Sequence, residues 1–166
     1  MTPVLPELGR AESTFLRVAT GAATTCVIDD VHRLWCAGVL DGAASCWGLS
    51  TAGELGLGMT NPLVPTTLPG AWRTLALGQS HGCGIASDGR LLCWGSNTSG
   101  VLGTGDWRST DAPVVVGTKQ TWSTVVASWS HTCALETDGS LWCWGDNEHG
   151  QLGTGTAWSN ELLWIR

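Results

Sequence analysis

The stretch HTCALETDGSLWCWG (residues 131–145) repeats the pattern of HGCGIASDGRLLCWG (residues 81–95) at a constant offset of 50 residues. The match begins at Trp72 and Trp122 and runs without a gap through the glycine-rich segment that follows each stretch. The identical positions are mostly Gly, Trp, Cys and an Asp-Gly pair, which are residue types that shape turns and fill cores. Self-similarity at a fixed period of this length predicts a repeat protein in which each copy folds as one supersecondary unit.

An earlier, imperfect copy occupies the first third of the chain. Its two ends keep the spacing of the later copies, at Phe15, Gly21, Cys26, Cys46, Trp47 and Gly48. Ten extra residues lie between these ends, because Cys26 and Cys46 are twenty positions apart, twice the spacing in the later copies. Cys36 lies midway and fits either register, as the counterpart of Cys143 or of Cys83. The sequence therefore leaves open which strand carries the insertion.

Each copy is predicted to form four short strands. Residues 123–127, 131–135 and 140–144 are short runs of apolar, aromatic and branched residues, and residues 113–116 are the equivalent last run of the second copy. The segment 145–155 is too rich in Gly for the interior of a strand or helix, and is expected to be a shaped loop. Four strands and one glycine loop in about 50 residues is the layout of a propeller blade. The predicted fold class is all-β, with three β-propeller blades.

We divide the chain into three repeats, at residues 15–70, 71–120 and 121–166, the first of which holds the insertion. Residues 1–14 are expected to contain an N-terminal strand from a preceding blade, because Pro3-Val4-Leu5-Pro6 resembles the last run of the second copy. A single blade buries too little surface to stand alone, and an array of three leaves two sheet faces uncovered. Self-association, or continuation in a longer chain, is therefore expected.

The cysteines are expected to form cross-strand disulfides. If Thr137-Asp138-Gly139 is a three-residue hairpin loop with Gly139 in the left-handed region, Cys133 falls directly opposite Cys143. The same count pairs Cys83 with Cys93, and directly opposed residues are close enough for a disulfide.

In the first copy Cys26 has Cys36 or Cys46 as partner, so one of the seven thiols is left over. Buried reduced cysteines are one alternative, and a zinc site that includes His81 and His131 is another, although no Cys-x-x-Cys knuckle accompanies them. The paired cysteines predict an extracytoplasmic or secreted protein.

The recurring motifs resemble those of a known family. They are His131-Thr132-Cys133-Ala134-Leu135, Asp138-Gly139, Leu141-Trp142-Cys143-Trp144-Gly145-Asp146-Asn147 and Gly150-Gln151-Leu152-Gly153-Thr154-Gly155. In this order they closely resemble the repeat of the regulator of chromosome condensation family, and its Cys-bearing version is similar to the bacterial branch, whose members are often extracytoplasmic. The resemblance implies a β-propeller that usually closes with seven blades. Three blades would make an incomplete ring.

Charge and hydropathy exclude several classes of partner. A net charge of −6 with only eight Lys plus Arg argues against a nucleic-acid surface. No apolar run approaches the roughly 18 residues that span a membrane, and the N-terminal residues lack the layout of a signal peptide.

No cofactor, metal or catalytic residue is expected. The Gly-x-Gly loops lack the helix and Lys of a phosphate cradle, and Asp146-Asn147-Glu148 is not repeated as a calcium site would require. His81 and His131 have no Ser or Asp in triad order nearby, and a structural hydrogen bond explains them better.

The aromatic composition is unusual, with eleven Trp and no Tyr. The repeated Trp47, Trp94 and Trp144, together with Phe15, Trp72 and Trp122, are expected to pack between blades. Trp107, Trp129, Trp158 and Trp164 have no repeat counterpart. Trp107, Trp129 and Trp158 are candidate partner-binding residues, because unrepeated aromatics on loops suit an interface; capping of an incomplete ring is the alternative.

The predicted function is a non-catalytic scaffold for protein interaction. A secreted inhibitor or ligand-binding propeller is the alternative. A light sensor of this repeat type has Gly-Trp-Arg-His-Thr where this chain has Ser128-Trp129-Ser130-His131-Thr132, so that function is disfavoured. An enzyme would need convergent polar residues that the repeat does not supply.

Overall fold

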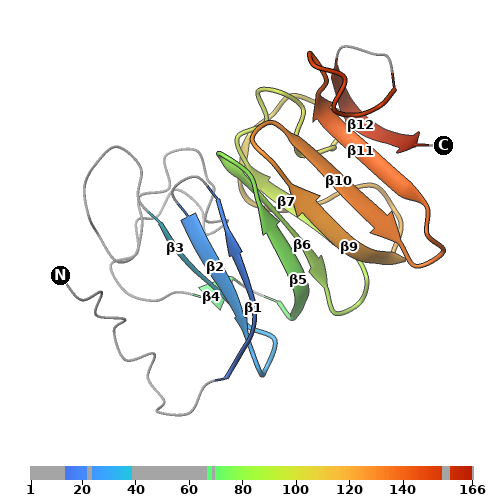
Figure 1. Ribbon diagram of the computed structural model, residues 1–166. Coiled ribbons are helices and arrows are strands. Elements are labelled where there is room, and N and C mark those ends of the chain that lie inside the picture. The colour runs from blue at the N-terminus through green and yellow to red at the C-terminus, as the bar shows by residue number, and fades with distance from the viewer. Residues whose placement is uncertain (1–13, 22–23, 39–66, 69, 155–157, 166) are drawn as a thin grey trace.

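The computed structural model describes residues 14–21, 24–38, 67–68, 70–154 and 158–165. These residues form three antiparallel four-stranded sheets in which neighbouring strands follow one another in the chain (Figure 1). The first sheet contains β1 (Phe15–Thr20), β2 (Thr24–Asp29), β3 (Leu34–Gly38) and β4 (Thr67–Leu68). The second contains β5 (Trp72–Leu77), β6 (His81–Ala86), β7 (Leu91–Gly95) and β8 (Thr110–Val115). The third contains β9 (Trp122–Ala127), β10 (His131–Glu136), β11 (Leu141–Asp146) and β12 (Trp158–Ile165).

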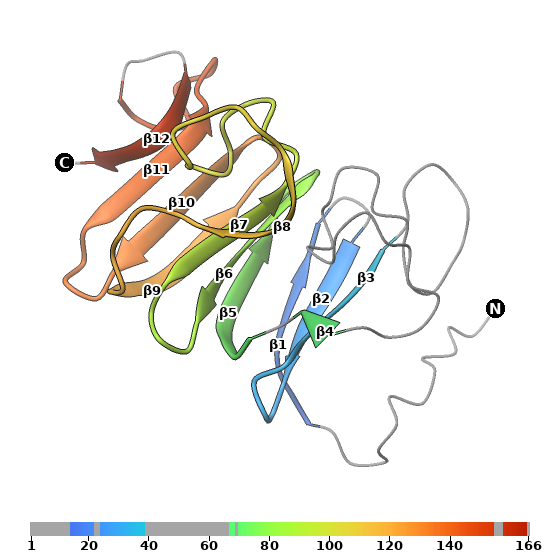
Figure 2. The same ribbon diagram turned by 180° about the vertical axis from the view of Figure 1, so that it is seen from behind.

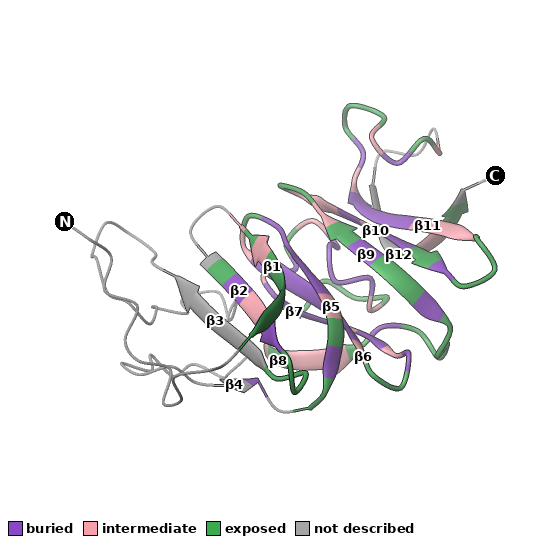
Figure 3. Cartoon of the chain, turned by 60° about the horizontal axis from the view of Figure 1, so that its bottom comes forward, coloured by how far each residue is buried: buried purple, intermediate pink, exposed green. Residues whose placement is uncertain are grey.

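The three sheets are propeller blades that pack face to face in chain order (Figures 1 and 2). Trp122 and Trp144 of the third blade share one buried cluster with Ile85 of the second. A second cluster joins Trp72 and other residues of the second blade to Ile28 of the first. The middle blade is thus covered on both faces, and Figure 3 shows buried residues concentrated in its strands while β1 is largely exposed. The predicted all-β, incomplete propeller is confirmed.

The repeated turn sets the register of the inner strands. Gly139 has a φ of 88°, a left-handed conformation that glycine adopts without strain, and the Glu136 amide donates to the Ser140 carbonyl oxygen at 2.9 Å. Cys133 then lies opposite Cys143, and the two form a disulfide with their Cα atoms 4.1 Å apart. The second blade repeats this arrangement with Cys83 and Cys93. Both predicted disulfides are present.

The first blade places Cys36 in one of its two candidate registers. Cys36 lies opposite Cys26, as Cys143 lies opposite Cys133, and Cys26 is disulfide-bonded. The insertion therefore follows β3, and Cys46 and Trp47 lie outside the described residues, as does the strand expected in residues 1–14.

The register of the first blade could not be predicted because its turn has a histidine in place of the glycine of the later blades. His32 has a φ of 62° where the later blades have a glycine, and no Asp-Gly pair marks the turn. The left-handed conformation is strained for a residue with a Cβ, and two hydrogen bonds of His32 offset this strain. The His32 carbonyl accepts the Trp72 amide at 2.9 Å, and His32 Nδ1 donates to the Trp72 carbonyl at 3.0 Å.

The repeated tryptophans pack between the blades, with one exception among their counterparts. Trp72, Trp94, Trp122 and Trp144 are buried, and the rings of Trp72 and Trp94 meet edge to face with centroids 5.6 Å apart. Phe15 was expected to be buried like Trp72 and Trp122, and this prediction is wrong, because Phe15 is exposed. Trp72 is covered by the first blade, whereas no described blade lies against Phe15.

Removing one disulfide should cost about 2 kcal/mol of unfolding free energy, toward the low end for such bonds, because Cys133 and Cys143 close a loop with a sequence separation of only 10. The variant Cys133→Ser, Cys143→Ser, compared with the wild-type chain by urea denaturation, measures this cost. Peptide mapping without reductant that finds all seven thiols free after oxidising purification would reject the bridges.

Candidate interaction surface

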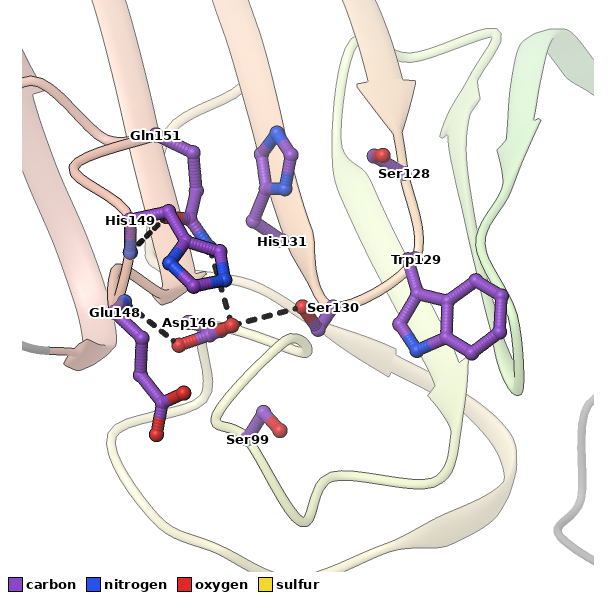
Figure 4. A pocket seen from close by; sticks show the side chains of 9 residues that line it. All are labelled: Ser99, Ser128, Trp129, Ser130, His131, Asp146, Glu148, His149 and Gln151. Carbon is purple, nitrogen blue, oxygen red and sulfur yellow. Dashed lines mark hydrogen bonds between the residues drawn. The ribbon is translucent and has the colours of Figure 1, made fainter.

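A hollow of about 640 Å³ lies at one end of the third blade (Figure 4). The loop between β9 and β10, the start of β10, the end of β11 and the loop after it form its wall, with one residue from the second blade. The lining residues are Ser99, Ser128, Trp129, Ser130, His131, Asp146, Glu148, His149 and Gln151. In Figure 4 the Trp129 ring and the Glu148 carboxylate stand on opposite sides of it.

Asp146 organises the wall of the hollow. One carboxylate oxygen accepts the Glu148 amide at 3.0 Å, and the other accepts Ser130 Oγ and Gln151 Nε2, each at 3.1 Å. The hydrogen bond from the Glu148 amide, helped by the two side-chain donors, holds the pKa of Asp146 below its ordinary value, although partial burial opposes this. Asp146 is therefore an anion that ties two loops together, rather than a proton donor or acceptor at neutral pH.

A buried asparagine shapes the loop that follows, and sequence reasoning did not single it out. Asn147 Oδ1 accepts the Leu152 amide at 2.7 Å, and Asn97 Oδ1 accepts the Leu102 amide at 3.0 Å in the second blade. The signal was available, because Asn97 and Asn147 are identical at the repeat offset. In each of these two blades the asparagine holds the glycine-rich segment as a loop, which agrees with the predicted turn role of the Gly-x-Gly sequences.

The predicted anchor tryptophans are placed differently from one another. Trp129 is 69% exposed and lines the hollow. Trp158 begins β12 opposite Asp146, so its backbone is at the same end of the blade, while its side chain lies outside the described residues. Trp107 is exposed on the loop before β8 and is not among the lining residues. The structure thus brings Trp129, but not Trp107, to the hollow.

The two repeated histidines have different surroundings. His81 is buried and its Nε2 lies 2.9 Å from Thr132 Oγ1, which itself donates to the Val101 carbonyl, so His81 donates to Thr132. Burial, reinforced by the nearby His131, lowers the pKa of His81 to about 4. This is the structural role that the sequence predicted. His131 instead borders the hollow.

Within the described ranges, no three His, Cys, Asp or Glu side chains are grouped as a metal site would require. Over the same residues, no helix is long and apolar enough to cross a membrane.

Comparisons with known proteins agree with this fold. Family models described as the regulator of chromosome condensation (RCC1) repeat match residues 72–101 and 122–151, and residues 88–135. No curated protein matches the chain.

Among solved structures, human WBSCR16 is similar with a TM-score of 0.75 and 21% identity, over 93% of this chain and 40% of that one. Prp20p from Saccharomyces cerevisiae is similar with a TM-score of 0.75 and 19% identity, over 92% of this chain and 38% of that one. Yeast RCC1 (Prp20) bound to Kap60 is similar with a TM-score of 0.71 and 19% identity, over 92% of this chain and 37% of that one. The chain spans about 40% of the length of these structures or less.

Proposed function

Because this chain belongs to the regulator of chromosome condensation repeat family, we propose that it is a non-catalytic β-propeller module that binds a protein partner. The observation that carries the proposal is the exposed Trp129 at the hollow of the third blade. A large exposed aromatic with polar neighbours is typical of the anchor of a protein interface. The second blade has Gln79 at this place, so the repeat itself does not require an aromatic.

The chemistry of the hollow supports binding rather than catalysis. Both carboxylate oxygens of Asp146 accept hydrogen bonds from other residues in the wall of the hollow. These hydrogen bonds lower the pKa of Asp146 and make it a weak base, whereas a general base works best with a pKa near the operating pH. Of the similar structures, Prp20p is described by its binding to Gsp1p and histones, and yeast RCC1 by its complex with Kap60. We propose protein binding for this chain on the same fold.

The disulfides Cys83–Cys93 and Cys133–Cys143 suit an oxidising environment. We propose that the module works outside the cytoplasm, and that Trp107 and Trp158 extend the partner surface beyond Trp129. The repeat boundaries at residues 15–70, 71–120 and 121–166 are proposed because each range holds one of the three four-stranded sheets.

Affinity capture from the culture medium and envelope fraction of the source cells tests the proposal. Trp129→Ala should weaken capture of the partner about thirtyfold, which corresponds to roughly 2 kcal/mol, while folding is unchanged. Trp164→Ala is the matched control, because Trp164 is also an exposed and unrepeated tryptophan but does not line the hollow. Equal capture by both variants would remove Trp129 from the interface, and capture of no protein at all would contradict the binding function.

A further inference from the structure

The hollow of the third blade has a counterpart in the second blade, and that counterpart is filled. His81 donates to Thr132 of the third blade at 2.9 Å. The Val101 carbonyl accepts Thr132 Oγ1 at 2.9 Å and Trp144 Nε1 at 2.7 Å. Fifty residues later His131 and Gln151 occupy the places of His81 and Val101, and both line the hollow. The histidine that seats a blade on the second blade therefore recurs on the third, where none of the described residues covers it, and Gln151 stands in the place of Val101.

The loops agree with this equivalence. The Gln79 amide of the second blade donates to the Trp129 carbonyl of the third at 3.4 Å, and a Cβ at Gly78 would meet the Ser128 carbonyl. The counterparts of Gly78 and Gln79 on the third blade are Ser128 and Trp129, which line the hollow. Ser128 carries a Cβ where Gly78 has none, so a blade seated on the third blade must lie somewhat farther away at this point. The hollow thus has the position of a seat for a further blade.

A histidine–threonine pair indicates which blade suits that seat. The second blade carries His81, which donates a hydrogen bond to Thr132 of the third blade. The first blade has Thr24 in place of the histidine, and the second blade correspondingly has Gly82 in place of the threonine. The third blade carries His131, so a blade seated on it should again supply a threonine.

The first blade has that threonine. Thr25 is the counterpart of Thr132 and is exposed. Thr25 pairs with Thr20 and Ala37, as Thr132 pairs with Ala127 and Trp144, so the two threonines lie on the same face of their sheets. The chain therefore carries a seat on one outer face and its matching threonine on the other.

The apolar residues of the two outer faces show the same complementarity. Val18 is 68% exposed, whereas its counterparts Leu75 and Val125 are 7% and 4% exposed in the inner junctions. On the opposite outer face, Leu135 is 37% exposed where Ile85 is fully buried. On both outer faces, apolar positions that are buried in the inner junctions are therefore exposed.

We infer that the hollow and outer face of the third blade seat the first blade of a second copy of this chain, with His131 donating to Thr25 of that copy. The inference rests on the proposed function, since it names the partner of the same surface. The contact is heterologous, because it joins two different faces. Two copies that close on each other fill both seats, and copies that do not close form an open array.

Single-face variants test the inference by light scattering after size exclusion. Val126 pairs with Cys133 and so lies on the same outer face of the third blade as Leu135. Val18→Asp damages only the first-blade face and Val126→Asp only the third-blade face, and both side chains are exposed, so neither change should unfold the chain. We expect at least twice the monomer mass for the wild type and the monomer mass for each variant alone. An equimolar mixture should recover twice the monomer mass, because one intact contact remains between the two variants.

The hydrogen bond has its own test. Thr25→Val and His131→Ala should each weaken self-association about fivefold, and the double variant no further. Thr118→Val is the control and should change nothing, because Thr118 is an exposed threonine that does not line the hollow. A monomeric wild type, a mixture that stays monomeric, or variants that associate like the wild type would overturn the inference. Capture of a different protein by a monomeric wild-type chain overturns it and leaves the proposed function standing.

Discussion

Trp144→Ala should lower the free energy of unfolding by about 3 to 5 kcal/mol, the range for removing a large aromatic side chain from a packed core. The side chain is fully buried between the second and third blades. Its Nε1 donates to the Val101 carbonyl at 2.7 Å. Only glycine fits at Gly103, because a Cβ there would lie 2.8 Å from this nitrogen. Urea denaturation at a protein concentration low enough to keep the chain monomeric measures the loss, since self-association would add to the apparent stability.

Trp129→Ala is the matched control, because it deletes the same side chain at a position that is mostly exposed. It should change the unfolding free energy by less than about 1 kcal/mol. Trp94→Ala, at the equivalent position of the second blade, should behave like Trp144→Ala. If Trp129→Ala unfolds the chain and Trp144→Ala is harmless, core and surface are assigned the wrong way round, and the interaction surface fails with them.

Acidification below pH 6.5 should destabilise the chain through His81. Burial, with a smaller contribution from His131, lowers the pKa of His81 from 6.5 to about 4. Between these values the unfolded chain binds a proton that the native chain does not, so stability falls as the pH falls. The contribution of His81 is fully present above pH 6.5, and about 2 kcal/mol of it should be lost by pH 5 and about 3 kcal/mol by pH 4.

His81→Gln isolates this effect, because the glutamine is neutral throughout and still carries a side-chain donor toward Thr132. Urea denaturation at pH 7.5, 6.5 and 5 should give a flatter pH dependence for this variant than for the wild type. His149→Gln, which removes an exposed imidazole, controls for the loss of one ring. Parallel pH profiles for the wild type and His81→Gln would show that burial of His81 does not penalise its protonation.

The features that repeat could be predicted because their causes are local. The Asp138-Gly139 turn sets the hairpin register, and the register alone places Cys133 opposite Cys143. Alternating short runs and the glycine loop identify a blade, and the buried Trp94 and Trp144 follow from recurring at the same place in it. The turn and the disulfide need only residues within one copy, and the tryptophans need only the comparison of one copy with another.

The candidate site was less predictable, because it depends on contacts between copies. Trp129 was identified as unrepeated, but its place beside Asp146 and His131 in one hollow follows from how three loops meet. Glu136 is a further case. Burial raises the pKa of Glu136, but the hydrogen bonds that it accepts from Lys119, Thr121 and Trp142 together outweigh burial and hold the pKa below its ordinary value. No spacing in the sequence joins these residues.

The sequence by itself determined the blade, its disulfide pairs and its core tryptophans, because turn geometry and strand alternation act over a few residues. Only the tertiary structure decided the register of the first blade, where contacts with Trp72 hold His32 in a conformation that its sequence does not announce. It also decided which faces are covered. Phe15 and Trp72 occupy the same place in their blades, and one is exposed and the other buried because burial is a property of the neighbouring blade.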